Sequence, residues 1–312
     1  MSLNNTDICG ETMAAQSRAI LRRMLPNHII RICTGSTAIF SSLIILVVVM
    51  KGWKHSLKSS HYVNVVNLAL ANLIYAGGVF GQAIKRGSLL YLGLDEVSSP
   101  SRCFVDKNLT TFGALMVTCF TLNMAAFRVL ALCYPLAFKK YVNISLTIKI
   151  SALLWLAFFM LNSSLILTIS PEKCIPGCLW RLVYLPVGQR MQTLLKFTTC
   201  SLSVIVCAFL AIMLLVRHVR RSQHVTDLIR ASRTSLLIAA DFLAFWIIPE
   251  LAIHIINVNN VRSAAALLLS NVPPINLLAA ICDLLIYVVA DKTFRKTIIT
   301  RNTEQSSTVT QM

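Results

Sequence analysis

The chain has 312 residues, of which 56% are hydrophobic and only 13% are charged, and its formal net charge is +17. A soluble domain has about 25% charged residues, so this composition excludes an ordinary soluble enzyme, an intrinsically disordered chain and a small secreted disulfide protein. Length alone would allow two soluble domains, but the apolar fraction favours one membrane bundle. In such a bundle, basic residues collect in cytoplasmic loops beside anionic lipid, so the charge does not indicate nucleic acid.

Long apolar runs predict an all-α fold with seven membrane-spanning helices. In chain order these runs cover residues 29–50, 62–83, 103–134, 147–169, 193–216, 234–256 and 264–290. Residues 1–28 have no apolar core of their own and predict an extracellular N-terminus, so that 29–290 form the seven-helix domain. A short membrane-surface helix is expected at 291–299, and a disordered cytoplasmic tail at 300–312.

The predicted topology places the protein in the plasma membrane, with the N-terminus outside and the C-terminus in the cytoplasm. Basic residues are more numerous in the loops that this topology makes cytoplasmic, although the excess is modest. Asn4, in Asn-Asn-Thr, is a glycosylation acceptor on the outer segment. A polar cluster of Ser and Thr at 306–310 could be phosphorylated and recruit arrestin.

Local motifs indicate a function. The segments are NLALANL at 67–73, FRVLALCYPL at 127–136, DLLIY at 283–287 and FRK at 294–296. Cys103 precedes Arg128 by 25 residues. In this order and spacing, these four segments and Cys103 resemble the corresponding parts of rhodopsin-like G-protein-coupled receptors. The resemblance extends over residues 30 to 299.

The resemblance implies roles for particular residues. Arg128 and Tyr287 would act in coupling to a heterotrimeric G protein, and Cys103 would form a disulfide with Cys174 or Cys178. The sequence does not choose between these two partners. Asn72 stands where the family has a sodium-binding aspartate.

Buried polar groups in a membrane bundle are costly and often functional. Asn72, Asn123 and Asp283 could therefore form one polar cluster between the second, third and seventh spans. One carboxylate could still serve a sodium or water site there, or the cluster could be a hydrogen-bonded packing feature. Asp241 is a second mid-span acid, for which the sequence names no partner.

Two departures from the family pattern stand out. Phe127 replaces the acid beside Arg128, so the adjacent ion pair is missing and raised basal activity is expected. Trp246 lies three residues before Pro249, whereas the family has two. The extra residue either turns this tryptophan by about 100° around the helix or requires a local bulge.

The resemblance also implies a ligand pocket lined by the outer halves of the third, fifth, sixth and seventh spans. Asp106, Thr110 and Ala114 share one helical face at i, i+4 and i+8. Thr110 occupies the position where amine receptors carry an aspartate, which disfavours a biogenic amine. The remaining pocket candidates are Lys196, Trp246, Glu250 and His254. A Glu250 pair with Lys196 or His254 could equally be a structural ion pair, or Lys196 could point toward the headgroups.

Other classes of function lack their signatures. The sequence has no internal repeats of the kind seen in transporters, and no HExxH, GxSxG or paired intramembrane Asp motif of an enzyme. No cofactor or metal is expected. A zinc site at Cys174 and Cys178 is disfavoured, because Glu172 is the only other candidate ligand nearby in sequence and no histidine is adjacent. Short termini and loops favour a small, odorant-like chemosensory ligand over a protein hormone. The alternatives are a peptide or lipid receptor, or a seven-helix transporter or channel.

Overall fold

The computed structural model describes residues 15, 17, 19, 21–22, 24–53, 57, 59–94, 96–169, 175–176, 183–219, 234, 237–252 and 262–298. Almost all of them are helical. The long helices are α3 (Leu25–Gly52), α4 (Ser60–Tyr91), α5 (Pro100–Cys133), α7 (Ile144–Ser164), α9 (Pro186–Val219) and α12 (Arg262–Ala290). The short ones are α6 (Pro135–Tyr141), the 3₁₀ turn η1 (Leu165–Thr168) and residues 292–298. Residues 237–252 are also helical and contain the π-helical segment η2 (Leu243–Ile247).

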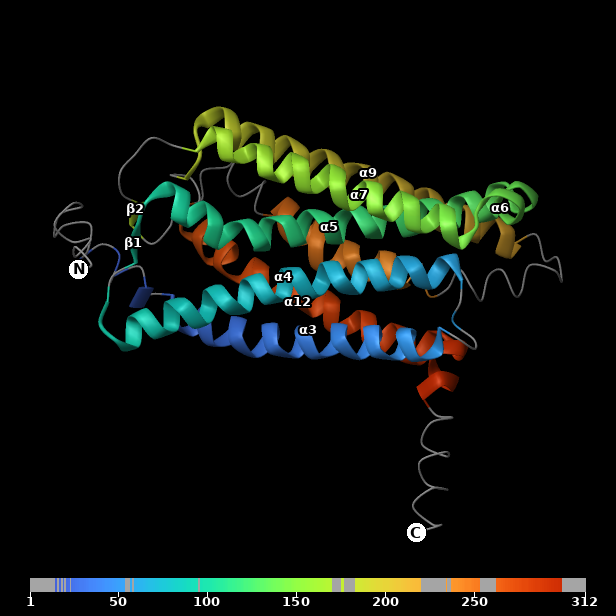
Figure 1. The fold of residues 1–312 in the computed structure, drawn as a ribbon, viewed down its shortest axis with the longest axis horizontal. Helices are drawn as coiled ribbons and strands as arrows, with labels where there is room; N and C mark the ends of the chain where they lie inside the picture. The colour runs from blue at the N-terminus through green and yellow to red at the C-terminus, as the bar shows by residue number, and fades with distance from the viewer. Residues whose placement is uncertain are drawn as a thin grey trace, which may run out of the picture.

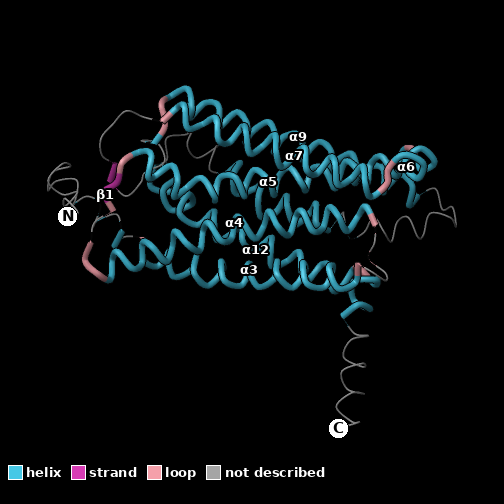
Figure 2. Tube along the Cα trace, in the orientation of Figure 1, coloured by secondary structure: helices cyan, strands magenta, loops and turns pink. Residues whose placement is uncertain are grey.

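The long helices run side by side and form a bundle with two distinct ends (Figure 1). One end carries an antiparallel pair of two-residue strands, β1 (Val97–Ser98) and β2 (Ile175–Pro176). The other end carries α6, and Figure 2 shows that the two ends are joined almost entirely by helix. We refer to these ends as the β1–β2 pole and the α6 pole.

Six described helices are long and apolar enough to cross a membrane. They are Leu25–Gly52, Ser60–Tyr91, Pro100–Cys133, Ile144–Thr168, Pro186–Met213 and Val272–Ala290. These six correspond to predicted spans one to five and seven. The predicted span at 234–256 is described as helix over 237–252, and since its other residues except 234 lie outside the described part, its status as a seventh span stays a prediction.

Helix α7 shows that the bundle is built for lipid rather than water. Its buried residues are all polar: Thr147, Ser151 and Asn162. Several of its large apolar side chains are exposed, among them Leu153, Leu156, Phe159 and Met160. This distribution would be unfavourable in water, so the protein is a multi-pass membrane protein whose outer surface faces hydrocarbon.

Helix ends follow local chain chemistry. The side chain of Ser99 accepts the backbone N–H of Arg102 (3.4 Å), and Pro100 begins α5, as proline does at the first turn of many helices. At the end of α4, Gly93 has φ +66°, a left-handed conformation that favours glycine. The amide of Leu94 then donates to Leu89 O at 2.9 Å, which closes the last turn. Helix α4 therefore continues eight residues beyond its predicted apolar run at 62–83.

Helix α4 packs most extensively against α3 and α5. Two glycines permit the close approach of α4 and α5. A Cβ atom on Gly78 would lie 2.6 Å from Thr110 Oγ1, and one on Gly113 would lie 2.6 Å from both N and Cα of Tyr75. Each helix thus presents a glycine to the other's backbone, the small-residue packing that membrane helices use.

Candidate functional site

The predicted polar cluster is divided between two levels of the bundle. Asn72 Nδ2 of α4 donates a hydrogen bond to Asp283 Oδ2 of α12 at 3.0 Å, and both side chains are buried. Asn123 is not part of this contact, since its Nδ2 donates to Asn64 Oδ1 at 3.0 Å. The structure therefore brings together two of the three predicted residues and gives the third a different partner on α4.

Asp241 has neighbours that the sequence did not reveal. This buried carboxylate accepts a hydrogen bond from the thiol of Cys282 and lies within electrostatic reach of Asp283. Asn72, Asp241, Cys282 and Asp283 thus form a polar layer between α4, α12 and the helix at 237–252. Within the described ranges, no group of three or more His, Cys, Asp or Glu side chains is arranged to hold a metal ion.

The extra residue before Pro249 is absorbed by a local bulge. Residues Leu243–Ile247 are π-helical, and the amide of Ile248 donates to Leu243 O, five residues back. Trp246 is consequently buried in the bundle. Its ring centroid lies 5.0 Å from that of Tyr75 and 6.2 Å from that of Phe242. Of the two alternatives that the sequence allowed, the structure has the bulge.

Asn276 holds this bulge from the neighbouring helix. In an α-helix the carbonyl of Phe245 would receive the N–H of residue 249, which is proline and has none. In the amide orientation that satisfies both of its polar atoms, Asn276 donates to Phe245 O at 2.6 Å and to Val272 O at 3.2 Å. Asn276 thereby supplies the hydrogen bond that Pro249 cannot make.

We expect Asn276→Leu to destabilise the protein by about 2 kcal/mol, because it removes the hydrogen bonds to the carbonyls of Phe245 and Val272. The cost should be smaller in a Pro249→Ala background, where residue 249 can donate to Phe245 O itself. Thermal unfolding of the wild type, the two single variants and the double variant, in matched lipid nanodiscs, measures this coupling. If the stability changes of the two single variants simply add up in the double variant, Asn276 does not act on the Phe245 carbonyl that Pro249 leaves without its helical donor.

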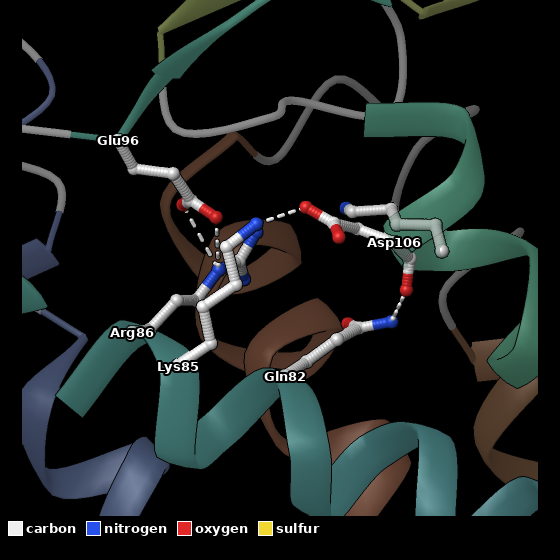
Figure 3. A pocket seen from close by; sticks show the side chains of 6 residues that line it. Gln82, Lys85, Arg86, Glu96 and Asp106 are labelled. Atoms are coloured by element: carbon white, nitrogen blue, oxygen red, sulfur yellow. Dashed lines mark hydrogen bonds and ion pairs between the residues drawn. The ribbon is translucent and has the colours of Figure 1, made fainter. Parts of the chain in front are cut away.

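The predicted pocket face of the third span is occupied by polar side chains of α4 (Figure 3). Gln82 Nε2 donates to Asp106 O and to Thr110 Oγ1, each at 2.8 Å. Lys85 forms an ion pair with the carboxylate of Asp106. Ala114 is half-buried and packs against the central hydrophobic core. In the described part of the chain, the hydrogen bonds and the ion pair of Asp106 and Thr110 on this face are therefore made with α4, and the pocket itself stays a prediction.

The structure describes only some of the remaining pocket candidates. Glu250 is half-buried and lies within electrostatic reach of Tyr75. The side chain of Lys196, and His254 as a whole, lie outside the described residues, and so does Asn4. The predicted pair of Glu250 with Lys196 or His254 stays a prediction.

Cys103 at the β1–β2 pole is disulfide-bonded. Both predicted partners, Cys174 and Cys178, lie outside the described residues, but β2 lies between them in sequence and pairs with β1 just before α5. Phe104 and Tyr184 pack edge to face beside this cysteine, with ring centroids 5.9 Å apart. Burial raises the pKa of the Tyr184 phenol, which therefore stays neutral at physiological pH.

A second charged cluster lies at the α6 pole. Arg128 of α5 interacts electrostatically with Tyr287 of α12, with Tyr62 of α4 and with Asp291. Asp291 Oδ2 accepts a hydrogen bond from the Tyr62 hydroxyl at 2.8 Å. Its other oxygen accepts the backbone N–H groups of Thr293 (2.9 Å) and Phe294 (3.0 Å) and so caps the helix at 292–298.

Tyr62 and Asp291 were not among the predicted site residues. An acid three positions before Phe294, at the start of a short helix, is a recognisable capping pattern. Nothing local in the sequence indicates that its second oxygen faces Tyr62, 229 residues away. Comparison with known sequences adds no assignment, since no family model and no curated protein matches the chain.

Proposed function

We propose that this protein is a divergent seven-helix receptor of the rhodopsin-like type, which activates a heterotrimeric G protein in response to a small extracellular molecule. The proposal rests on the motif resemblance and on one structural observation. Arg128 and Tyr287, from motifs far apart in the sequence, come within electrostatic reach of each other at one pole of a lipid-facing bundle.

The proposed mechanism follows from the positions of the charges. Arg128 lies at the end of a membrane helix, where a guanidinium can reach water and an incoming protein partner. At rest, it lies within electrostatic reach of Tyr62, Tyr287 and Asp291. Ligand binding at the opposite pole would favour a bundle in which these helices separate, and Arg128 would then contact the C-terminal segment of the G protein.

Under this proposal the α6 pole is cytoplasmic and the β1–β2 pole is extracellular, in the plasma membrane. The ligand would be a chemosensory molecule small enough to enter between the outer helix ends. Phosphorylated residues of the tail would recruit arrestin. The helix at 292–298 would lie along the membrane surface, and the helix at 237–252 would belong to the sixth of seven spans.

Basal nucleotide exchange tests the proposal without knowledge of the ligand. Purified protein in nanodiscs should accelerate binding of a fluorescent GTP analogue to at least one purified heterotrimeric G protein. Arg128→Ala should lower this rate about tenfold, as expected when one charged contact is lost. Lys149→Ala is the matched control, since Lys149 is exposed on α7, and it should leave the rate unchanged.

Two results would contradict the proposal. One is the absence of exchange with every G-protein class. The other is an Arg128→Ala variant that is folded and as active as the wild type.

A further inference from the structure

The last turns of α3 mark the level at which the hydrocarbon layer meets the lipid headgroups. Large apolar side chains are exposed at helical spacing along one side of this helix, and we call them the α3 stripe: Phe40, Leu43, Ile44, Val47 and Met50. The helix rises about 15 Å from the first of them to the last, which is the depth of one leaflet of a bilayer. The next residue, Lys51, is exposed. Its ammonium group can therefore reach the headgroups of the lipids that cover the stripe.

The helix at 292–298 lies beside this end of α3, as the short red segment after α12 shows in Figure 1. A Cβ atom on Gly52 would lie 3.0 Å from Thr297 Cγ2, so the two helices are in contact there. Phe294 is fully buried and anchors the short helix in the core. The following residue, Arg295, is exposed. The exposed side of this helix therefore borders the end of the α3 stripe.

Lys51 and Arg295 are cations that the described part of the chain does not neutralise. Neither side chain forms an ion pair or a hydrogen bond with a described residue. Asp291, which precedes the short helix, uses one carboxylate oxygen for the Tyr62 hydroxyl and the other for two backbone amides. Lys296 is exposed as well but has a further interaction within the chain, so the site does not depend on it. Two cations beside an apolar stripe match an anionic headgroup that carries acyl chains.

We propose that this corner of the α6 pole binds one anionic phospholipid, with its phosphate between Lys51 and Arg295 and its acyl chains along the α3 stripe. The fork of a guanidinium binds two phosphate oxygens, and an ammonium adds a point charge. A zwitterionic headgroup brings a cation of its own, which these two side chains repel. The inference goes beyond the proposed receptor function and does not depend on it.

Native mass spectrometry of the full chain measures the preference for one lipid over another. The protein is released from maltoside micelles that contain equal amounts of phosphatidylglycerol and phosphatidylcholine. Protein with one bound lipid should carry phosphatidylglycerol about twentyfold more often than phosphatidylcholine, because two cations attract the net negative headgroup. Lys51→Gln and Arg295→Gln should each lower this ratio about fivefold. Arg295→Lys keeps the charge and should retain most of the preference.

Lys139→Gln is the matched control. Lys139 is an exposed lysine at the same pole, but it belongs to α6, away from the end of α3 (Figure 1). Its substitution should leave the ratio unchanged. All these side chains are exposed, so the variants are expected to fold, and their Tm in phosphatidylcholine nanodiscs verifies this. An excess of glycerol 3-phosphate should not displace the lipid, because the soluble headgroup lacks the acyl chains that cover the stripe.

The proposal is overturned if the two lipids are retained equally. It is also overturned if Lys139→Gln lowers the ratio as much as Lys51→Gln does, since the pole would then attract anionic lipid without a defined site. Displacement by glycerol 3-phosphate or by inorganic phosphate would indicate a site for soluble phosphate and would equally contradict it. No G protein is present in this assay, so its failure is separable from a failure of nucleotide exchange.

Discussion

Replacing Gly113 with alanine is expected to destabilise the bundle by about 3 kcal/mol, the upper part of the range for overpacking. The added methyl group would lie 2.6 Å from N and Cα of Tyr75 and 2.9 Å from its Cβ. Two of these atoms belong to the backbone of α4, so no side-chain rotation removes the overlap. The two helices must separate, which also disturbs the contact of Gly78 with Thr110.

Gly77 and Gly81 provide matched controls on α4. A Cβ atom at either position would meet nothing within 4 Å. Alanine there should be neutral or stabilise the protein by about 0.5 kcal/mol, because it favours the helical backbone. Thermal unfolding of Gly113→Ala, Gly77→Ala and Gly81→Ala in matched lipid nanodiscs measures whether the change in stability is negative for the first variant and zero or positive for the other two. A Gly113→Ala variant as stable as Gly81→Ala would show that α4 and α5 do not approach as described.

The second large effect is expected at Asp291. If Arg128 is the coupling residue, Asp291→Asn should raise basal nucleotide exchange about fivefold, because about 1 kcal/mol of electrostatic restraint on the resting state is lost. An asparagine can still cap the helix at 292–298 through its carbonyl oxygen. The substitution therefore removes the charge that faces Arg128 while it keeps the local backbone in place.

Three further variants define the role of Asp291. Tyr62→Phe removes the 2.8 Å hydrogen bond to Asp291 but keeps the carboxylate, and it should raise exchange less than Asp291→Asn does. Lys292→Gln changes an exposed neighbour and should have no effect. Arg128→Ala should abolish the increase. Unchanged basal exchange in Asp291→Asn, with a protein that couples normally, would contradict the proposed restraint.

This arrangement changes the expectation for Phe127. The sequence lacks an acid beside Arg128, which predicted an unrestrained arginine. In the structure Phe127 packs edge to face on Phe138 of α6, with ring centroids 6.3 Å apart, and the Asp291 carboxylate lies within electrostatic reach of Arg128. An electrostatic partner for a membrane arginine can thus come from a different helix, which adjacent-residue patterns cannot reveal.

Much of the fold is readable from the sequence, because each membrane helix needs a long apolar run. The positions at which the helices end cannot be read from the sequence in the same way. Helix α4 continues to Tyr91 through Lys85 and Arg86, polar residues that a hydropathy argument places outside the span. Their side chains are accommodated by Asp106 and Glu96, which come from elsewhere in the chain. These ion pairs accommodate the polar residues of the last turns, and the turn at Gly93 then ends the helix.

The sequence likewise indicates which polar residues are buried but not which of them contact one another. Buried Asn72 and Asp283 stand out in apolar helices, and they do meet. Asn123 pairs with Asn64, two turns or about 12 Å along α4 from Asn72, because a residue on a crossing helix can reach only one level. The bulge at Leu243–Ile247 was one of two alternatives, and its support by Asn276 required knowledge of how α12 packs.

The inverted polarity of α7 has a consequence for handling the protein. Besides the packing of Trp155 on Phe112 and Phe120, this helix is held by polar contacts, including Trp155 Nε1 to Asn67 Oδ1 at 2.7 Å and a hydrogen bond from Asn162 to Asn108. Such bonds contribute only about 0.6 kcal/mol each in lipid, and water that penetrates a loose micelle competes for the same donors. Helix α7 is therefore expected to be sensitive to the choice of detergent, and loss of its polar contacts should precede a loss of helical content.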